Sequence, residues 1–182
     1  MKMFRTCFVF FAALLLLIGP GLVEAQAVTS NVATVTLNAT VSTTLTVTAT
    51  PSTVTFSGSG TSTTPVSGSS PISVTTTWNL STTATLTVYE YFATTTALTN
   101  SGPTMPSSAV TASVNGGAAT PFTGTCAAVS ITGSCGPNVA SVAITAANLN
   151  STRTDSVALA INMNGAPAGA YTGTWNVEAI AI

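Results

Sequence analysis

The chain has 182 residues, a formal net charge of −1, only 4% charged residues and no histidine. General acid–base catalysis and metal binding depend mainly on histidine, lysine, cysteine and clustered carboxylates, so this composition argues against an enzyme and against a metal or other cofactor. Arg153 is the only basic residue after residue 27, and a single cation cannot neutralise several phosphates, which excludes nucleic-acid binding.

Residues 1–27 have the pattern of a secretory signal peptide. Two basic residues near the start precede an apolar run over residues 8–18, and small residues then offer cleavage after Ala25 or Ala27. The apolar run is shorter than the ~20 residues that span a bilayer, so we expect no transmembrane segment in the mature chain. The sequence therefore predicts a secreted protein, periplasmic in transit and then extracellular or on the cell surface, with one domain over residues 28–182.

The first alternating segment of the mature chain runs from Ala33 to Ala49. Its odd positions are apolar apart from Thr43, and its even positions are mainly threonine, which is the period of a half-buried β-strand. One strand of this length would measure about 55 Å, far more than usual. We therefore expect a break near Ser42 and Thr43, as a hairpin or as a strand that passes between two sheets.

Further strands are predicted at the spacing of an all-β domain. The expected strands are 54–56, 74–80, 84–88, 110–114, 142–144, 157–163 and 171–179, with a loop over 58–71. Turns are expected at 100–103 and at 115–117, where asparagine and glycine accept positive φ. These elements predict a single immunoglobulin-like or jelly-roll β-sandwich of about 7–9 antiparallel strands.

Two cysteines and two tryptophans are expected to stabilise this domain. Cys7 is removed with the leader, which leaves Cys126 and Cys135 as a pair in an oxidising compartment and predicts a disulfide. Trp78 and Trp175 are predicted to anchor the core, with an exposed sugar-stacking platform as the alternative.

The three acidic residues of the mature chain are interpreted as surface groups. Glu90, Asp155 and Glu178 would need a close pair to act in glycoside hydrolysis, and nothing in their spacing favours one. Arg153 and Asp155 are expected to form a solvated pair in a loop, and a calcium site on Asp155 and nearby asparagines lacks the usual run of acids. With no group expected to titrate near neutrality, the fold should be nearly insensitive to pH between about 5 and 9.

The C-terminal stretch 167–182, with its Pro-Ala-Gly-x-Tyr-x-Gly turn and alternating final strand, resembles that of small secreted bacterial β-sandwich proteins. The resemblance is to the spore coat protein U and chaperone-usher pilin type. It implies assembly by strand donation, in which an N-terminal segment of one subunit completes the sheet of the next. The candidate donor residues here are Val32, Val35, Leu37, Ala39 and Val41. The alternative is that this segment is the first strand of its own domain.

The sequence thus predicts a non-enzymatic structural subunit of a coat, pilus-like fibre or surface layer that assembles by edge or donor-strand pairing. Few charges oppose self-association, so the partner is expected to be a second copy or a related surface subunit. The alternative is a secreted, adhesin-like binding module for a glycan or partner protein. Its contacts would be the loops 58–71 and 94–107 and the aromatic residues Tyr89, Tyr91 and Tyr171.

Overall fold

The structure is a computed structural model that describes residues 31–123 and 133–182. The leader and Cys126 lie outside the described residues. Residues 1–39 and 40–182 form separate units, and the sheets belong to the second.

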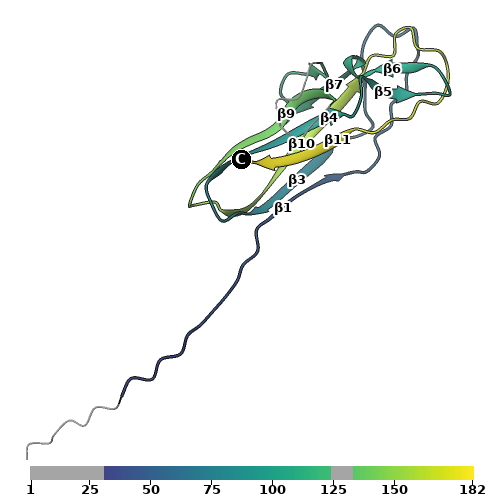
Figure 1. Ribbon diagram of the computed structural model, residues 1–182. Helices are drawn as coiled ribbons and strands as arrows, with labels where there is room; N and C mark the ends of the chain where they lie inside the picture. Colours follow the sequence, from purple (N-terminus) through teal and green to yellow (C-terminus); the bar gives the residue numbers. More distant parts are fainter. Residues whose placement is uncertain (1–30, 124–132) are drawn as a thin grey trace, which may run out of the picture. The chain divides into compact units, whose positions relative to one another are not determined.

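The larger sheet is antiparallel and has the strand order β1-β3-β10-β7-β8, with β2 beside one end of β10. Its strands are β1 (Thr44–Thr50), β2 (Val66–Ser67), β3 (Ile72–Asn79), β7 (Val110–Val114), β8 (Thr120–Pro121) and β10 (Asn150–Ile161). Alternating valine and threonine suit these strands because branched side chains pack well on a pleated surface. The central pair, β3 and β10, lies between β1 and β7 (Figure 1), and β8 forms the far edge beyond β7.

The second sheet has three antiparallel strands in the order β11-β4-β9. These are β4 (Ala84–Phe92), β9 (Ser134–Ile144) and β11 (Asn176–Ala181). A small third sheet pairs β5 (Thr96–Thr99) with β6 (Thr104–Pro106), and a 3₁₀ turn, η1 (Ser107–Ala109), links it to β7. The C-terminal strand β11 is thus an edge strand that pairs with β4 alone among the described strands.

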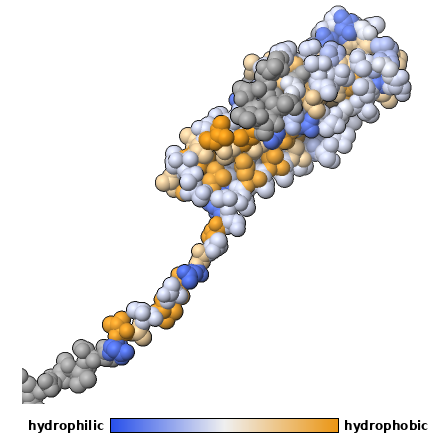
Figure 2. Space-filling model, viewed as in Figure 1, coloured by the Kyte–Doolittle hydropathy of each residue, from blue (hydrophilic) through white to orange (hydrophobic). Residues whose placement is uncertain are grey.

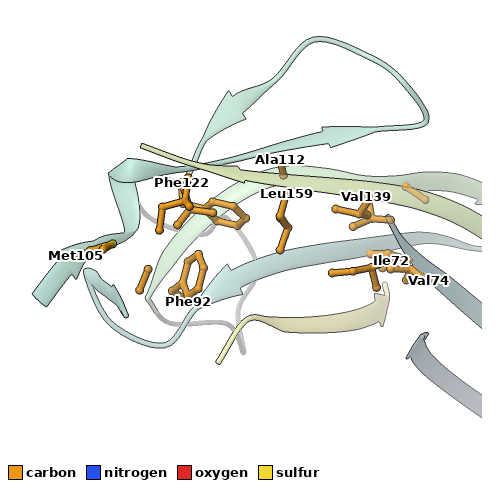
Figure 3. Close-up of a cluster of buried hydrophobic side chains, with 14 residues drawn as sticks. Ile72, Val74, Phe92, Met105, Ala112, Phe122, Val139 and Leu159 are labelled. Atoms are coloured by element: carbon orange, nitrogen blue, oxygen red, sulfur yellow. The ribbon is translucent and has the colours of Figure 1, made fainter. Parts of the chain in front are cut away.

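Both large sheets contribute to one hydrophobic core. Ile72, Val74 and Leu159 from the larger sheet pack in the same cluster as Phe92 and Val139 from the smaller one (Figure 3). Burial of each aliphatic or aromatic side chain stabilises the folded state by roughly 1.5–3 kcal/mol.

The cluster closes at one end on two phenylalanines. The rings of Phe92 and Phe122 meet edge to face with their centroids 4.8 Å apart. A smaller cluster of Trp78, Leu86 and Ile144 closes the other end, and the Trp78 indole donates a hydrogen bond to the Asn148 carbonyl at 2.8 Å. Trp78 is therefore a core anchor, as predicted.

The all-β prediction is confirmed, and both predicted turns form. Asn115 and Gly116 adopt positive φ of 51° and 73°, and they connect β7 to β8. Ser101 and Gly102 do the same between β5 and β6, with φ of 44° and 141°. The described chain has 11 strands rather than 7–9, because short pairs such as β5 and β6 are too brief to show a period.

Several predicted boundaries are wrong. No strand forms at 54–56, the predicted loop 58–71 contains β2, and the predicted loop 94–107 contains β5 and β6. The last strand starts at Asn176, not at Tyr171. Strand pairing decides these limits, and local alternation does not reveal it.

The polar stretch 150–155 was predicted to be a loop, yet it is the first half of β10. Its threonines pair with those of β3 through hydroxyl contacts, Thr75 with Thr154 at 3.0 Å and Thr77 with Thr152 at 2.9 Å. Cross-strand hydroxyl pairs stabilise a sheet face that carries no apolar side chain. Hydrophobic periodicity therefore misses this half of the strand.

Candidate functional site: an open sheet edge backed by a buried carboxyl group

The two large sheets end side by side at β1 and β11. These two edge strands are in contact but belong to different sheets, and no backbone ladder joins them among the described residues. Their outer edges therefore carry backbone N–H and C=O groups that the sheets leave unpaired.

The core is incompletely covered at this edge. Every residue of β11 is half-buried, whereas the neighbouring strand β4 buries alternate residues almost fully. The apolar side chains of β1 and of the inward face of β11 pack on the core while staying partly exposed: Leu45, Val47, Ala49, Val177, Ala179 and Ala181. Figure 2 shows apolar side chains gathered over this part of the surface. We call β1, β11 and these six side chains the open edge.

The candidate donor segment does not form the half-buried strand that its alternation predicts. Residues 31–43 are all exposed, and no strand is assigned to them. The four large apolar side chains of the segment are 79–90% exposed: Val32, Val35, Leu37 and Val41. β1 begins at Thr44, directly after the predicted break near Ser42 and Thr43, but neither a hairpin nor a strand passing between sheets forms there, because the residues before the break pair with no strand of the described chain. Alternation marks a residue pattern suited to a strand, and it does not guarantee a partner.

Directly behind the open edge lies a buried acid, Glu90 of β4. Its side chain points into the core in the same phase as Leu86 and Val88, and the residue is 1% exposed. Oε2 accepts a hydrogen bond from the Trp175 indole N–H at 3.0 Å, and Oε1 has no hydrogen-bond partner within residues 31–123 and 133–182. Burial raises the pKa of Glu90 to about 8, against the smaller lowering effect of the Trp175 hydrogen bond.

Two predictions about Glu90 are therefore wrong. It is not a surface acid, and it titrates inside the range in which the fold was expected to be insensitive to pH. The sequence did carry a signal, because Glu90 occupies the same alternating phase as the apolar residues on either side of it in β4.

The second buried acid, Asp155, lies in β10 and is 4% exposed. Its Oδ2 accepts from Arg153 Nε at 2.7 Å, and its Oδ1 accepts from Arg153 Nη2 at 2.7 Å and from Asn115 Nδ2 at 2.8 Å. Burial by itself would raise the pKa of Asp155, but these bonds and the Arg153 charge lower it overall. The predicted ion pair forms, although within a strand and around a buried carboxylate rather than in a solvated loop.

The structure does not bring the acids together. Glu90 faces the core from β4, and Glu178 on β11 is paired with Tyr89 on the opposite face of the sheet. Asp155 is engaged with Arg153 in the other sheet. The considered calcium site is not assembled either, because Asn148 uses its side-chain oxygen on Thr145. Over the described ranges, no group of three or more histidine, cysteine or acidic residues is placed to hold a metal ion.

The three tyrosines considered as ligand contacts are half-buried and do not share one environment. Tyr89 and Tyr91 project from the outer face of β4, where a hydrogen bond joins Tyr91 and Glu178. The hydroxyl of Tyr171 donates to the Pro167 carbonyl at 3.0 Å and so closes the turn before β11.

A pocket of about 460 Å³ lies between the small sheet and the strand-like stretch before β11. Its lining is uncharged and rich in hydroxyl groups: Ala93, Thr94, Thr96, Ala97, Thr99, Thr104, Thr172, Gly173, Thr174 and Asn176. Two backbone bonds between Thr99 and Thr172, at 2.9 and 3.0 Å, hold its wall. Gly173 has no side chain because a Cβ there would overlap the Ala97 carbonyl oxygen. The glycine of the C-terminal motif thus permits close approach to β5.

Cys135 lies in β9, in register with Tyr91 of β4. Cys126 lies outside the described residues, so the disulfide stays a prediction. Among the residues that the structure describes, no helix is both long and apolar enough to cross a membrane.

No family model, curated protein or solved structure matches this chain. We therefore infer function from the geometry of the open edge and of residues 31–41.

Proposed function

We propose that this protein is a secreted, non-enzymatic structural subunit that assembles with further copies of itself by β-strand pairing at the open edge. The observation that carries the proposal is a complementarity within one chain. Residues 31–41 offer an alternating strand that pairs with nothing in the described chain, and β11 offers an unpaired strand edge beside incompletely covered apolar side chains.

The pairing would satisfy both partners. Backbone hydrogen bonds would form along the edge of β11, and one face of the added strand would cover the apolar side chains between β11 and β1. From Ala33 to Val41 the odd-numbered residues are apolar and the even-numbered ones are threonine or asparagine, so a single register buries the first set and exposes the second, with Val32 in the phase of the exposed set. Neither partner carries a basic residue, and Glu178 of β11 is the only acid, so little charge opposes the contact.

The same features support a coat, pilus-like fibre or surface layer as the assembled form, and a leader over residues 1–27 supports export to the cell surface. The resemblance of residues 167–182 to spore coat protein U and chaperone-usher pilins fits this reading. A chain that donates at one end and accepts at the other forms an open, head-to-tail assembly.

The test compares the same pair of charged substitutions on the two faces of residues 31–41. In the mature secreted protein, Val35→Asp with Leu37→Asp places charges on the face proposed to be buried, and Thr34→Asp with Thr36→Asp places the same charges on the opposite face. We expect monomers from the first variant and assemblies from the second, as measured by light scattering and electron microscopy. Assembly by both variants, or by a chain that lacks residues 28–41, would contradict the proposal.

A glycan-binding module is the second candidate, and the hydroxyl-lined pocket is the observation that favours it. Neutral hydroxyl and amide groups suit a neutral sugar. Retention of monomeric protein on a glycan array, lost on Thr172→Val and kept on Thr111→Val outside the pocket, would support this function. The absence of retention would exclude it for the sugars on the array.

A further inference from the structure

Glu90 connects the buried core to the strand that forms the open edge. It lies directly opposite Val177 of β11 in the β4–β11 register, and its carboxyl group accepts a hydrogen bond from Trp175, just before that strand begins. At its other end β11 is held by backbone bonds between Thr85 and Ile182, at 2.7 and 3.1 Å. Glu90 therefore provides a side-chain attachment for the first half of this edge strand on the core side, and the hydrogen bond between Tyr91 and Glu178 provides one on the outer face.

The carboxyl group occupies an environment that suits its neutral form. Among the described residues, Oε1 has no hydrogen-bond partner, Oε2 has one neutral donor, and no cation is among the influences on the carboxyl group. A carboxylate in this position needs water, and the neighbouring edge strand β11 is half-buried at all six residues, so its displacement would admit solvent. Displacing β11 breaks pairing with one neighbour only, whereas displacing the central strand β4 would break pairing with two.

Among the described residues, no other titratable group acts on the pKa of Glu90. On β4 and β11 the remaining ones, Tyr89, Tyr91 and Glu178, lie on the outer face, and on β9 Cys135 is paired with Tyr91. In the opposite sheet β1 and β3 carry none, and Arg153 and Asp155 of β10 are bonded to each other. Burial and the Trp175 hydrogen bond are the two causes that set the pKa of Glu90, so the other described charged side chains do not influence its titration.

We propose that Glu90 controls the position of β11 in a pH-dependent way. As a neutral acid Glu90 holds β11 closed over the core, and as a carboxylate it favours release of the strand. We call this role of Glu90 the latch. Because β11 provides the edge of the proposed assembly, the latch makes self-assembly dependent on pH. This second step rests on the proposed function, whereas the latch itself is a property of one chain.

The direction and range of the effect follow from linkage. The closed state has a Glu90 pKa of about 8, and an opened, solvated Glu90 returns toward its ordinary value of 4.5. Between these two values opening releases a proton, so the opening constant of β11 rises about tenfold for each pH unit and levels off above pH 8. From pH 5.5 to pH 8, where Glu90 is half-titrated in the closed state, the expected increase is about 150-fold, and it reaches about 300-fold on the plateau above pH 9.

The first experiment measures the latch without assembly. Amide hydrogen exchange of residues 176–181 is compared at each pH between the wild-type chain and Glu90→Gln, both carrying Val35→Asp and Leu37→Asp to keep them monomeric. The exchange rate of the wild type divided by that of Glu90→Gln should rise with pH up to about 8 and then stay constant. Glu178→Gln, which removes a carboxylate from the outer face of the same strand, should follow the wild type. A ratio that does not change with pH would overturn the latch, and Glu90→Met provides a second neutral variant if Glu90→Gln fails to fold.

The second experiment measures assembly of the mature chain between pH 5 and 9.5 by light scattering. We expect wild-type assemblies at pH 5 that dissociate as the pH approaches 8, and Glu90→Gln assemblies that persist. Wild-type assemblies that persist equally at all pH values would overturn the coupling and leave the proposed function intact. Absence of assembly at every pH would overturn the proposed function, and the exchange experiment would still decide the latch.

Discussion

Glu90 and Asp155 are both carboxyl groups buried in β-strands, and their surroundings move their pKa values in opposite directions. Asp155 receives three hydrogen bonds, two of them from a guanidinium, whereas Glu90 receives one from a neutral indole. Desolvation is the first influence on both groups, but only Asp155 has partners strong enough to reverse it. Burial thus does not decide the charge of an acid in this fold, and the donors around it do.

The largest expected effect is the pH dependence that Glu90 gives to stability. The folded state holds the Glu90 proton up to about pH 8 and the unfolded state releases it near 4.5, so the free energy of unfolding falls as the pH rises between these values. The loss should be about 5 kcal/mol in total, with no further loss above pH 8. Urea unfolding at pH 4.5, 6, 7, 8 and 9 measures it.

Glu90→Gln is the control for this dependence. It should remove the slope and, at pH 7, make the chain more stable than the wild type by up to about 3 kcal/mol. Asp155 contributes with the opposite sign, because its lowered pKa gives stability that is lost only on acidification below its ordinary value of 3.8. A wild-type profile that is flat from pH 5 to 8 would contradict the role of Glu90.

A smaller effect is expected from the partner of the other acid. Arg153→Met leaves the Asp155 carboxylate buried with Asn115 as its one side-chain donor, and should lower the free energy of unfolding by about 2 kcal/mol at pH 7. The loss is moderate because the Arg153 side chain is 42% exposed and water can reach the pair. Arg153→Lys should lose about half as much, since it keeps the charge without the two-pronged contact. At pH 3 the difference in the free energy of unfolding between the wild type and Arg153→Met should be smaller. An equally large difference at pH 3 would contradict the role of the Arg153–Asp155 ion pair.

The smallest effect concerns the one donor of Glu90. The Trp175 hydrogen bond lowers the pKa of Glu90, so Trp175→Phe should raise it above 8, by about one pH unit or less. The Glu90 side-chain carboxyl carbon reports this shift in an NMR titration. A titration midpoint that stays the same or moves down would mean that the indole does not stabilise the carboxylate.

The central strands could be predicted because their alternation is intact. Val74 to Leu80 and Val110 to Val114 alternate clearly, and β3 and β7 form at these positions. The turn at Asn115 was also predictable, since asparagine and glycine tolerate the φ values that it needs. The polar half of β10 was not, because its threonines are held by hydroxyl groups on β3 and not by burial.

The candidate site was only half visible in the sequence. The alternating segment 31–41 and the final strand could both be found from their residue patterns. Their lack of partners could not, because an alternating strand looks the same whether it is paired, exposed or at an edge. Tyr89, Tyr91 and Tyr171 were identified by residue type alone, and the structure does not gather them into one surface.

By itself the sequence determined the all-β fold class, through its threonine and valine alternation and its turn residues. Only the tertiary structure decided which strand edge stays open and which acids carry charge. The physical reason is that alternation is a property of one strand, whereas desolvation and hydrogen bonding depend on what lies across from it. Glu90 and Asp155 illustrate this, since each is a lone acid within its strand, and only packing gave one a guanidinium and left the other facing an indole.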